Sequence, residues 1–144
     1  MGSLKAGFSR IDITPPLGIY LSGYYEPRQA GGQLDPLLAS ALAVSDGDET
    51  ALLFSVDVIG IKQDVLDGMR ERIAAACGLC RSQVFIACTH IHTGPEMSGR
   101  LFPVDPVYNA RFEHLLAQAG VAAISDLKPA TLLTARGTAP GISF

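Results

Sequence analysis

The chain has 144 residues, of which 48% are hydrophobic and 17% are charged, so it is long enough to bury a core as one globular domain. Its formal net charge of −3 offers no excess of Lys and Arg with which to bind nucleic acid or an anionic membrane. No stretch approaches the roughly 20 apolar residues of a membrane span, and the N-terminus lacks the apolar run of a signal peptide. These features predict a cytoplasmic protein, with a secreted protein that has lost its leader as the alternative.

The first half of the chain predicts a strand, a long loop and an antiparallel hairpin. Residues 7–13 form a short strand that ends at Thr14-Pro15-Pro16. The Gly/Tyr/Pro-rich loop that follows extends to about Pro36, and loops of this length often have a functional or covering role. Apolar runs over residues 38–44 and 50–59 flank the turn sequence SDGDE, a pattern typical of a hairpin.

The second half alternates helices with strands. Apolar residues at helical spacing predict a helix over residues 64–77, with Asp64 as its N-cap and Gly78 at its C-terminal end. A buried strand over residues 83–89 follows, and Asp105-Pro106 begins a second helix that extends to about residue 127. A last strand is expected over residues 130–136. The order predicts an α/β fold with a mixed, partly parallel sheet, an antiparallel hairpin and at least two helices.

The three cysteines are an odd number, which leaves one thiol over in any intramolecular pairing and favours a reducing compartment. Cys77 and Cys80 form a CGLC pattern that is compatible with a redox or zinc site. However, they lie near the C-terminal end of the predicted helix, where a thiolate is not stabilised. Cys88 belongs to the following strand and lies too far away to complete a zinc knuckle. We therefore expect all three thiols to be structural and buried.

Two of the chain's three histidines lie in the stretch ACTHIHTGPEMSGR, directly after the buried strand that ends near residue 89. A strand, helix, strand crossover makes two parallel strands whose carboxyl ends share one edge of the sheet. Asp57 and His90 should therefore be neighbours, at the edge where α/β sheets bind ligands. In extended backbone, residues two apart face the same side, so His90 and His92 are expected to face one cavity.

Imidazole is a common zinc ligand, and a catalytic zinc needs about three protein ligands and one open position. From spacing alone two interpretations stay open: both histidines are ligands, or they belong to a hydrogen-bonded polar loop. Asp57 either orients an imidazole N–H or caps the turn at the strand end. Glu96 as a carboxylate ligand or base and Ser98 as a nucleophile are further candidates, although loop residues of these types are usually polar surface. The third histidine, His114, is expected to be solvated on the second helix.

The sequence THIHTGP resembles the T-H-T-H-S-G-P signature of the neutral/alkaline, non-lysosomal ceramidase family. The opening GFSRIDITPP and the hairpin ending FSVD occur in similar order in the N-terminal region of that family, so the resemblance covers essentially the whole chain. It implies that residues 1–144 are a single, truncated N-terminal portion of a zinc-dependent amide hydrolase. It also implies that His90 is a Zn²⁺ ligand and that His92 is a catalytic group beside it. Asp57 is the third expected site residue, because the crossover between parallel strands places it beside His90.

The resemblance also implies that the other zinc ligands (a second His, a Glu and a Tyr) and a serine nucleophile come from chain beyond residue 144. The Zn²⁺ site would then be incomplete in this chain, which alone should be inactive. The expected substrate is ceramide or a related small-molecule amide or lipid. The motif departs from the family at Ile91, Thr93 and Glu96-Met97, where Gly-Gly is frequent, so the pocket should differ beside the metal.

Two alternatives remain: a metal-dependent hydrolase of a non-lipid amide or ester, and a non-catalytic binding or assembly fragment. A sheet cut before it is finished would expose apolar surface, which predicts self-association.

Overall fold

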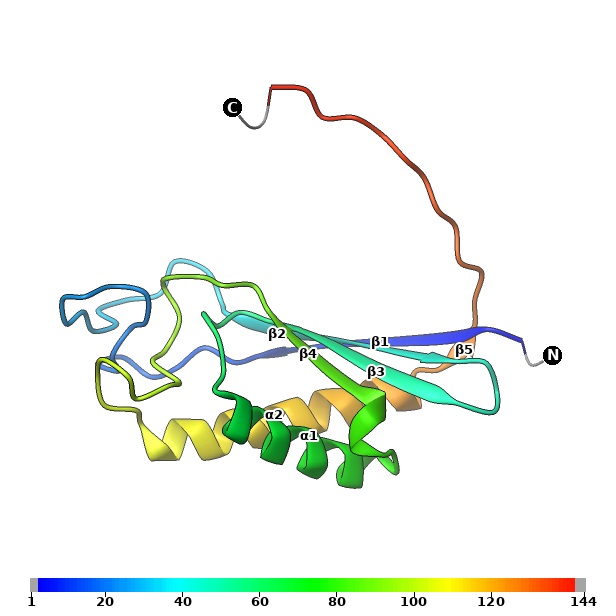
Figure 1. Ribbon diagram of the computed structural model, residues 1–144, viewed down its shortest axis with the longest axis horizontal. Coiled ribbons are helices and arrows are strands. Elements are labelled where there is room, and N and C mark those ends of the chain that lie inside the picture. Colours follow the sequence, from blue (N-terminus) through cyan, green and yellow to red (C-terminus); the bar gives the residue numbers. More distant parts are fainter. Residues whose placement is uncertain (1–2, 142–144) are drawn as a thin grey trace.

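The chain folds as a five-stranded mixed sheet with two helices on one of its faces (Figure 1). The computed structural model describes residues 3–141. In chain order the elements are β1 (Lys5–Asp12), β2 (Leu38–Ser45), β3 (Thr50–Val56), α1 (Gln63–Cys77), the 3-10 helix η1 (Arg81–Gln83), β4 (Val84–Cys88), α2 (Pro106–Ser125) and β5 (Lys128–Pro129). The strand order is β4-β3-β2-β1-β5, with β3 and β4 parallel and the other neighbours antiparallel. The predicted fold class, hairpin and parallel pair are confirmed.

The parallel pair brings the ends of two strands to one edge of the sheet. β3 and β4 are in register from Leu52 opposite Val84 to Val56 opposite Cys88, with α1 as the connection between them. Both strands therefore end at the same edge. The long loop of residues 14–36 and the loop that follows β4 lie together at this end of the molecule (Figure 1).

Small residues allow α2 to pack closely against the sheet. β2 turns Ala39, Ala41 and Ala43 toward the helices, and all three are buried. A Cβ atom on Gly7 of β1 would lie only 2.7 Å from the backbone nitrogen of Leu127, so this position has no room for a side chain. The core is filled by large apolar residues of the helices and of the strand face that they cover. The largest include Phe112, Leu52, Met69, Ile73 and Leu116.

The helix ends follow the sequence signals in all but one case. Asp105 Oδ1 accepts hydrogen bonds of 2.9 Å from the backbone N–H groups of Val107 and Tyr108, which confirms the predicted start of α2. Gly78 ends α1 in the left-handed conformation, as expected. The prediction of Asp64 as N-cap is wrong. The N-cap is Lys62, because its carbonyl already accepts the helical bond from Leu66 N at 2.8 Å and so places Asp64 inside the first turn.

Neither α1 nor α2 combines the length and apolar character of a membrane-crossing helix.

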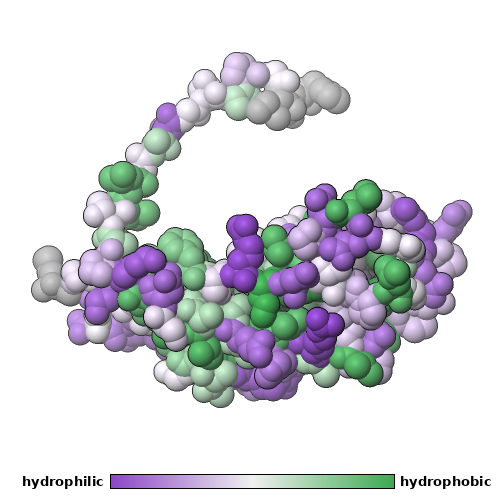
Figure 2. Space-filling model, turned by 180° about the vertical axis from the view of Figure 1, so that it is seen from behind, coloured by the Kyte–Doolittle hydropathy of each residue, from purple (hydrophilic) through white to green (hydrophobic). Residues whose placement is uncertain are grey.

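The predicted last strand over residues 130–136 is also wrong. β5 has two residues, Lys128 and Pro129, which pair with Ala6 and Lys5 at the start of β1. One more antiparallel bond follows, from Ala130 N to Leu4 O at 2.9 Å, and beyond it residues 131–136 pair with no strand of the part of the chain that the structure describes. The segment therefore leaves the body on the side of the sheet away from the helices, with hydrophobic residues exposed along it (Figures 1 and 2).

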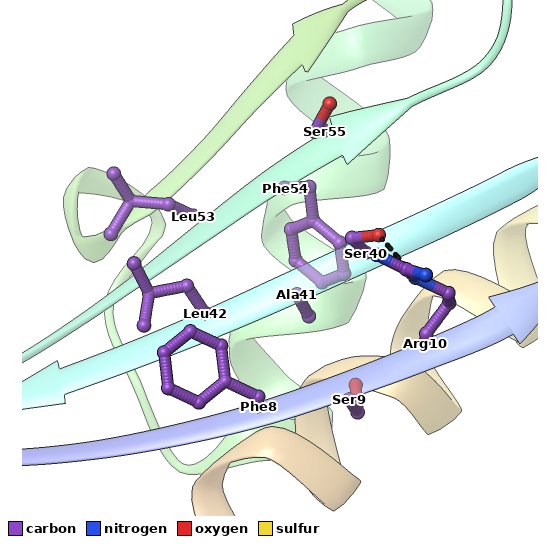
Figure 3. Close-up of a pocket in the computed structure, with 9 residues that line it drawn as sticks. All are labelled: Phe8, Ser9, Arg10, Ser40, Ala41, Leu42, Leu53, Phe54 and Ser55. Atoms are coloured by element: carbon purple, nitrogen blue, oxygen red, sulfur yellow. Dashed lines mark hydrogen bonds between the residues drawn. The ribbon is translucent and has the colours of Figure 1, made fainter.

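The face of the sheet opposite the helices is uncovered in residues 3–141. Phe8, Leu42 and Leu53 project from β1, β2 and β3 around a shallow hollow of about 630 Å³ (Figure 3). Phe8 is 62% exposed and Leu53 is 41% exposed. Apolar surface of the predicted kind is thus present on this face, while self-association stays a prediction.

The cysteines divide into two kinds. Cys77 and Cys88 are half-buried, and burial raises the pKa of both thiols above the ordinary value. Cys80 is exposed, so the prediction that it is buried is wrong. It precedes η1, where its backbone N–H is held by the side chain of Gln83, and this turn lies at the surface.

Candidate functional site

The loop that carries the histidines, residues 89–105, begins where β4 ends and is called the histidine loop below. Thr89 N and His90 N donate to the carbonyls of Val56 and Val58 at 2.9 and 3.1 Å, so the pairing with the segment after β3 continues past the last residue of the strand. His90 then adopts φ = 63°, in the left-handed region that few residues other than glycine enter. The prediction of extended backbone through both histidines is therefore wrong at His90.

The two imidazoles nevertheless meet. The ring centroids of His90 and His92 are 5.3 Å apart with an interplanar angle of 65°. Both rings line one cleft of about 780 Å³, as the sequence predicts, although the backbone reaches this arrangement through a turn. The rings of Tyr24 and His92 form a T-shaped pair with centroids 5.8 Å apart, and the guanidinium of Arg28 lies 4.2 Å from the centroid of the Tyr24 ring.

The second wall of the cleft comes from the long loop of residues 14–36. Ser22 N donates to the carbonyl of Gly94 at 3.0 Å and Glu96 N to that of Tyr20 at 2.8 Å, which joins this loop to the histidine loop. Gly23, at φ = +97°, lies directly against His92, and a Cβ atom here would be 2.6 Å from His92 Nδ1. Sequence reasoning missed Gly23 and Tyr24 as site residues. The available signal was the unusual length of a loop rich in Gly and Tyr.

The hydrogen bond of His90 selects one tautomer. Its Nδ1 lies 2.8 Å from the carbonyl oxygen of Ile59. Because a carbonyl only accepts hydrogen bonds, Nδ1 carries the proton in this contact, and in the neutral ring Nε2 then keeps its lone pair. This is the form in which an imidazole coordinates a metal through Nε2, with a carbonyl fixing the ring from behind.

Asp57 lies near His90 at the same edge of the sheet, but its carboxylate makes no hydrogen bond to the His90 imidazole. Its Oδ2 accepts from Leu38 N at 2.9 Å, and its Oδ1 accepts from the hydroxyl of Thr89 at 3.0 Å. The orienting contact expected from Asp57 is made by the Ile59 carbonyl instead. Asp57 therefore ties β2 to the residue before His90, and its influence on the site runs through the backbone. Its catalytic role stays a prediction.

Glu96 and Ser98 form a closed local network. The side chain of Glu96 is buried, and its Oε1 accepts from Ser98 N at 2.7 Å, from Ser98 Oγ at 2.6 Å and from Gly99 N at 3.1 Å. This geometry supports an anchoring role for the carboxylate and directs the serine proton toward it. Both residues line the cleft, so their roles as ligand or base and as nucleophile stay predictions. His114 is exposed on α2 beside Gln118, as expected.

The donor set fits only part of a catalytic zinc shell. Within residues 3–141, no group of three or more His, Cys, Asp or Glu side chains is arranged to hold a metal ion. His90 offers a free Nε2 and His92 lies beside it, against the roughly three protein ligands that a catalytic zinc needs. A complete shell thus requires donors other than those of the described residues.

Comparison with known proteins identifies the fold. The crystal structure of neutral ceramidase from Pseudomonas aeruginosa matches with a TM-score of 0.78 at 19% sequence identity, over 90% of this chain and 22% of that one. A ceramidase complexed with C2 matches with a TM-score of 0.76, at the same identity and coverage. This chain therefore has a ceramidase-like fold and spans about 22% of the length of those proteins. No protein-family model and no curated protein sequence matches it.

Proposed function

We propose that this chain forms the N-terminal part of a zinc-dependent amide hydrolase of the neutral ceramidase type, and that the cleft at His90 and His92 is part of its active site. One observation carries the proposal. Two imidazoles 5.3 Å apart face a cleft at the carboxyl edge of a parallel strand pair, in a fold shared with neutral ceramidase at a TM-score of 0.78.

The roles follow from the contacts of each ring. His90 would hold the metal through Nε2, because Nδ1 donates to Ile59 and so fixes both tautomer and ring orientation. His92 would handle a proton or position the amide, since its ring packs between Tyr24 and His90 at the cleft surface. When bound, zinc supplies a Lewis acid for the amide carbonyl and lowers the pKa of a coordinated water. The other ligands and the nucleophile would come from the rest of the whole protein.

The residues after the Gly-Pro turn favour an amide that differs from ceramide. Glu96 and Met97 replace the Gly-Gly pair that is frequent in the family, and both are 4% exposed. Glu96 lines the cleft, so a carboxylate-bearing side chain stands where the frequent glycine has none. A non-lipid amide or ester is therefore the second candidate substrate.

The test is hydrolysis by the full-length protein. Ceramide, other N-acyl amides and esters of matched acyl length would be incubated with the protein with and without a zinc chelator, and amine or alcohol release would be measured. We expect turnover that chelation and His90→Ala abolish and that His114→Ala, a matched histidine variant outside the cleft, preserves. Absence of turnover on every substrate would favour the non-catalytic alternative and contradict the proposal. Equal turnover by the His90→Ala variant would exclude this cleft as the active site.

A further inference from the structure

The cleft at the histidine pair carries an uncompensated positive charge. Lys62, which precedes α1, and Arg100, in the histidine loop, both line it and are exposed. Within residues 3–141 neither side chain forms an ion pair. Carboxylates pair with Arg70, Arg72, Arg81 and Lys128, whereas among the described residues Lys5, Arg10, Arg28, Arg111 and Arg136 form no ion pair either, so the lack of a pair alone does not set this cleft apart; the two charges lining one cleft do. Two cations therefore face the same space as the two imidazoles.

The acidic component of the cleft does not offset these charges. Among the described residues that line it, Glu96 is the one carboxylate. Its Oε1 is occupied by three hydrogen bonds from its own loop, two from Ser98 and one from Gly99. One carboxylate stands against two cations, and its charge is already partly balanced by these donors. The cleft is thus suited to an anion.

Apart from Ser22, Ser98 and glycines, the rest of the lining is apolar or aromatic. Tyr25 is 94% exposed and Leu101 is 50% exposed, and both line the cleft together with Tyr24. Such surface accepts an acyl chain, while the cations accept a negatively charged group on the same molecule. A ligand with both parts matches the cleft better than a neutral lipid does.

The histidine loop holds the backbone of Arg100 in place. Arg100 N donates to Ser98 Oγ at 3.1 Å, and that hydroxyl donates to the buried carboxylate of Glu96 at 2.6 Å. The backbone that carries the guanidinium is therefore fixed before a ligand arrives, which lowers the ordering cost of binding. A guanidinium binds a carboxylate through two parallel hydrogen bonds, so Arg100 can select for this group by geometry as well as by charge.

We propose that the cleft selects amides that carry a carboxylate near the amide bond, such as N-acyl amino acids, and that Arg100, assisted by Lys62, binds this carboxylate. The inference rests on the proposed function, because it assumes that the ligand of the cleft is an amide. It assigns substrate specificity to two residues outside the histidine pair.

The test compares two ligands of equal chain length, N-octanoylglycine and neutral N-octanoylethanolamine. Dissociation constants would be measured by NMR titration of the 144-residue chain in a chelator, so that neither metal nor turnover contributes. We expect N-octanoylglycine to bind about 10-fold more tightly, with a preference that falls as salt is raised. The double variant Lys62→Ala/Arg100→Ala should lose the preference and keep its affinity for the neutral amide. Arg136→Ala, an exposed charge removal outside the cleft, should keep the preference.

Several results would overturn the inference: equal affinities in the parent chain, no binding of either amide, or a preference that survives the double variant. These results are distinguishable from failure of the proposed function. Carboxylate-dependent binding by a full-length protein that hydrolyses no amide would remove the function and keep the selectivity. Zinc-dependent hydrolysis of both amides without a preference between them would remove the selectivity and keep the proposed function.

Discussion

The close approach of Gly23 to His92 makes the position of the second histidine directly testable. A Cβ atom on Gly23 would lie 2.6 Å from His92 Nδ1 and 2.8 Å from His92 Cβ. Ordinary packing contacts are about 3.5 Å and His92 Cγ is closer still, so Gly23→Ala requires a shift of about 0.7 to 1.1 Å between the two loops. Rotation of the imidazole cannot supply this shift, because the His92 Cβ atom is itself too close.

Gly18 provides a matched control. It has φ = +84°, close to the +97° of Gly23, but a Cβ atom at Gly18 meets nothing within 4 Å. Both Gly→Ala substitutions place alanine in the left-handed region at a cost of about 1–2 kcal/mol. The difference between the two variants therefore isolates the displacement of His92. A misplacement near 1 Å lowers turnover by about 10²-fold where a side chain acts directly in the reaction.

The assay combines urea unfolding with NMR of the imidazole protons, and turnover where the full-length protein is used. Gly18→Ala should lose stability alone, with the His92 resonances unchanged. Gly23→Ala should lose more stability, shift the His92 and Tyr24 resonances and reduce turnover by about 10²-fold. If the His92 resonances stay in place in Gly23→Ala, or move equally in both variants, the contact between Gly23 and His92 does not set the position of the ring.

Three further predictions concern the scaffold, and each is checked by chemical denaturation. Gly7→Ala should destabilise the fold by about 3 kcal/mol, because the new Cβ atom meets the backbone at the end of α2; a loss below about 0.5 kcal/mol would contradict this packing. Tyr108→Phe should cost about 1–3 kcal/mol, because the buried hydroxyl donates to the Ile13 carbonyl at 2.5 Å and no replacement donor is present among the described residues; an unchanged stability would refute it. The hydrogen bond from Phe8 N holds the pKa of Asp126 below its ordinary value of 3.8, so its contribution to stability is present above pH 3.8 and is lost as the pH falls through the lowered value. Asp126→Asn should flatten this acid dependence, and an identical pH profile in the variant would contradict the assignment.

Most of the fold could be predicted from sequence because its elements have local signals. The hairpin follows from two apolar runs around SDGDE, and the start of α2 follows from an acidic N-cap before proline. Residues 130–136 have similar local character but form no strand, because the pairing of β5 with β1 reaches only Lys5 and no other described strand lies beside them. Strand formation depends on a partner as well as on propensity. The displaced N-cap of α1 has a similar origin, since the backbone bond to Lys62 takes precedence over the capping preference of Asp64.

The position of the candidate site in the fold could be predicted from sequence, but the geometry of its residues could not. Strand order and the crossover correctly bring Asp57, His90 and His92 to one edge. The left-handed turn at His90 and the orienting carbonyl of Ile59 have no sequence signature, because both depend on backbone geometry after the strand ends. Gly23 and Tyr24 reach His92 through contacts between loops that are distant in sequence, which local sequence patterns do not reveal.

The most direct test of the account is zinc content and turnover measured on the same preparations of full-length His90→Ala and His92→Ala. If His90 is the ligand and His92 acts beside the metal, His90→Ala should lose zinc and activity together. His92→Ala should keep its zinc while its rate falls by about 10² to 10⁴-fold, the usual contribution of acid–base assistance. A full zinc content in His90→Ala would contradict the central claim. Equal loss of zinc from both variants would make both histidines ligands and remove the catalytic role proposed for His92.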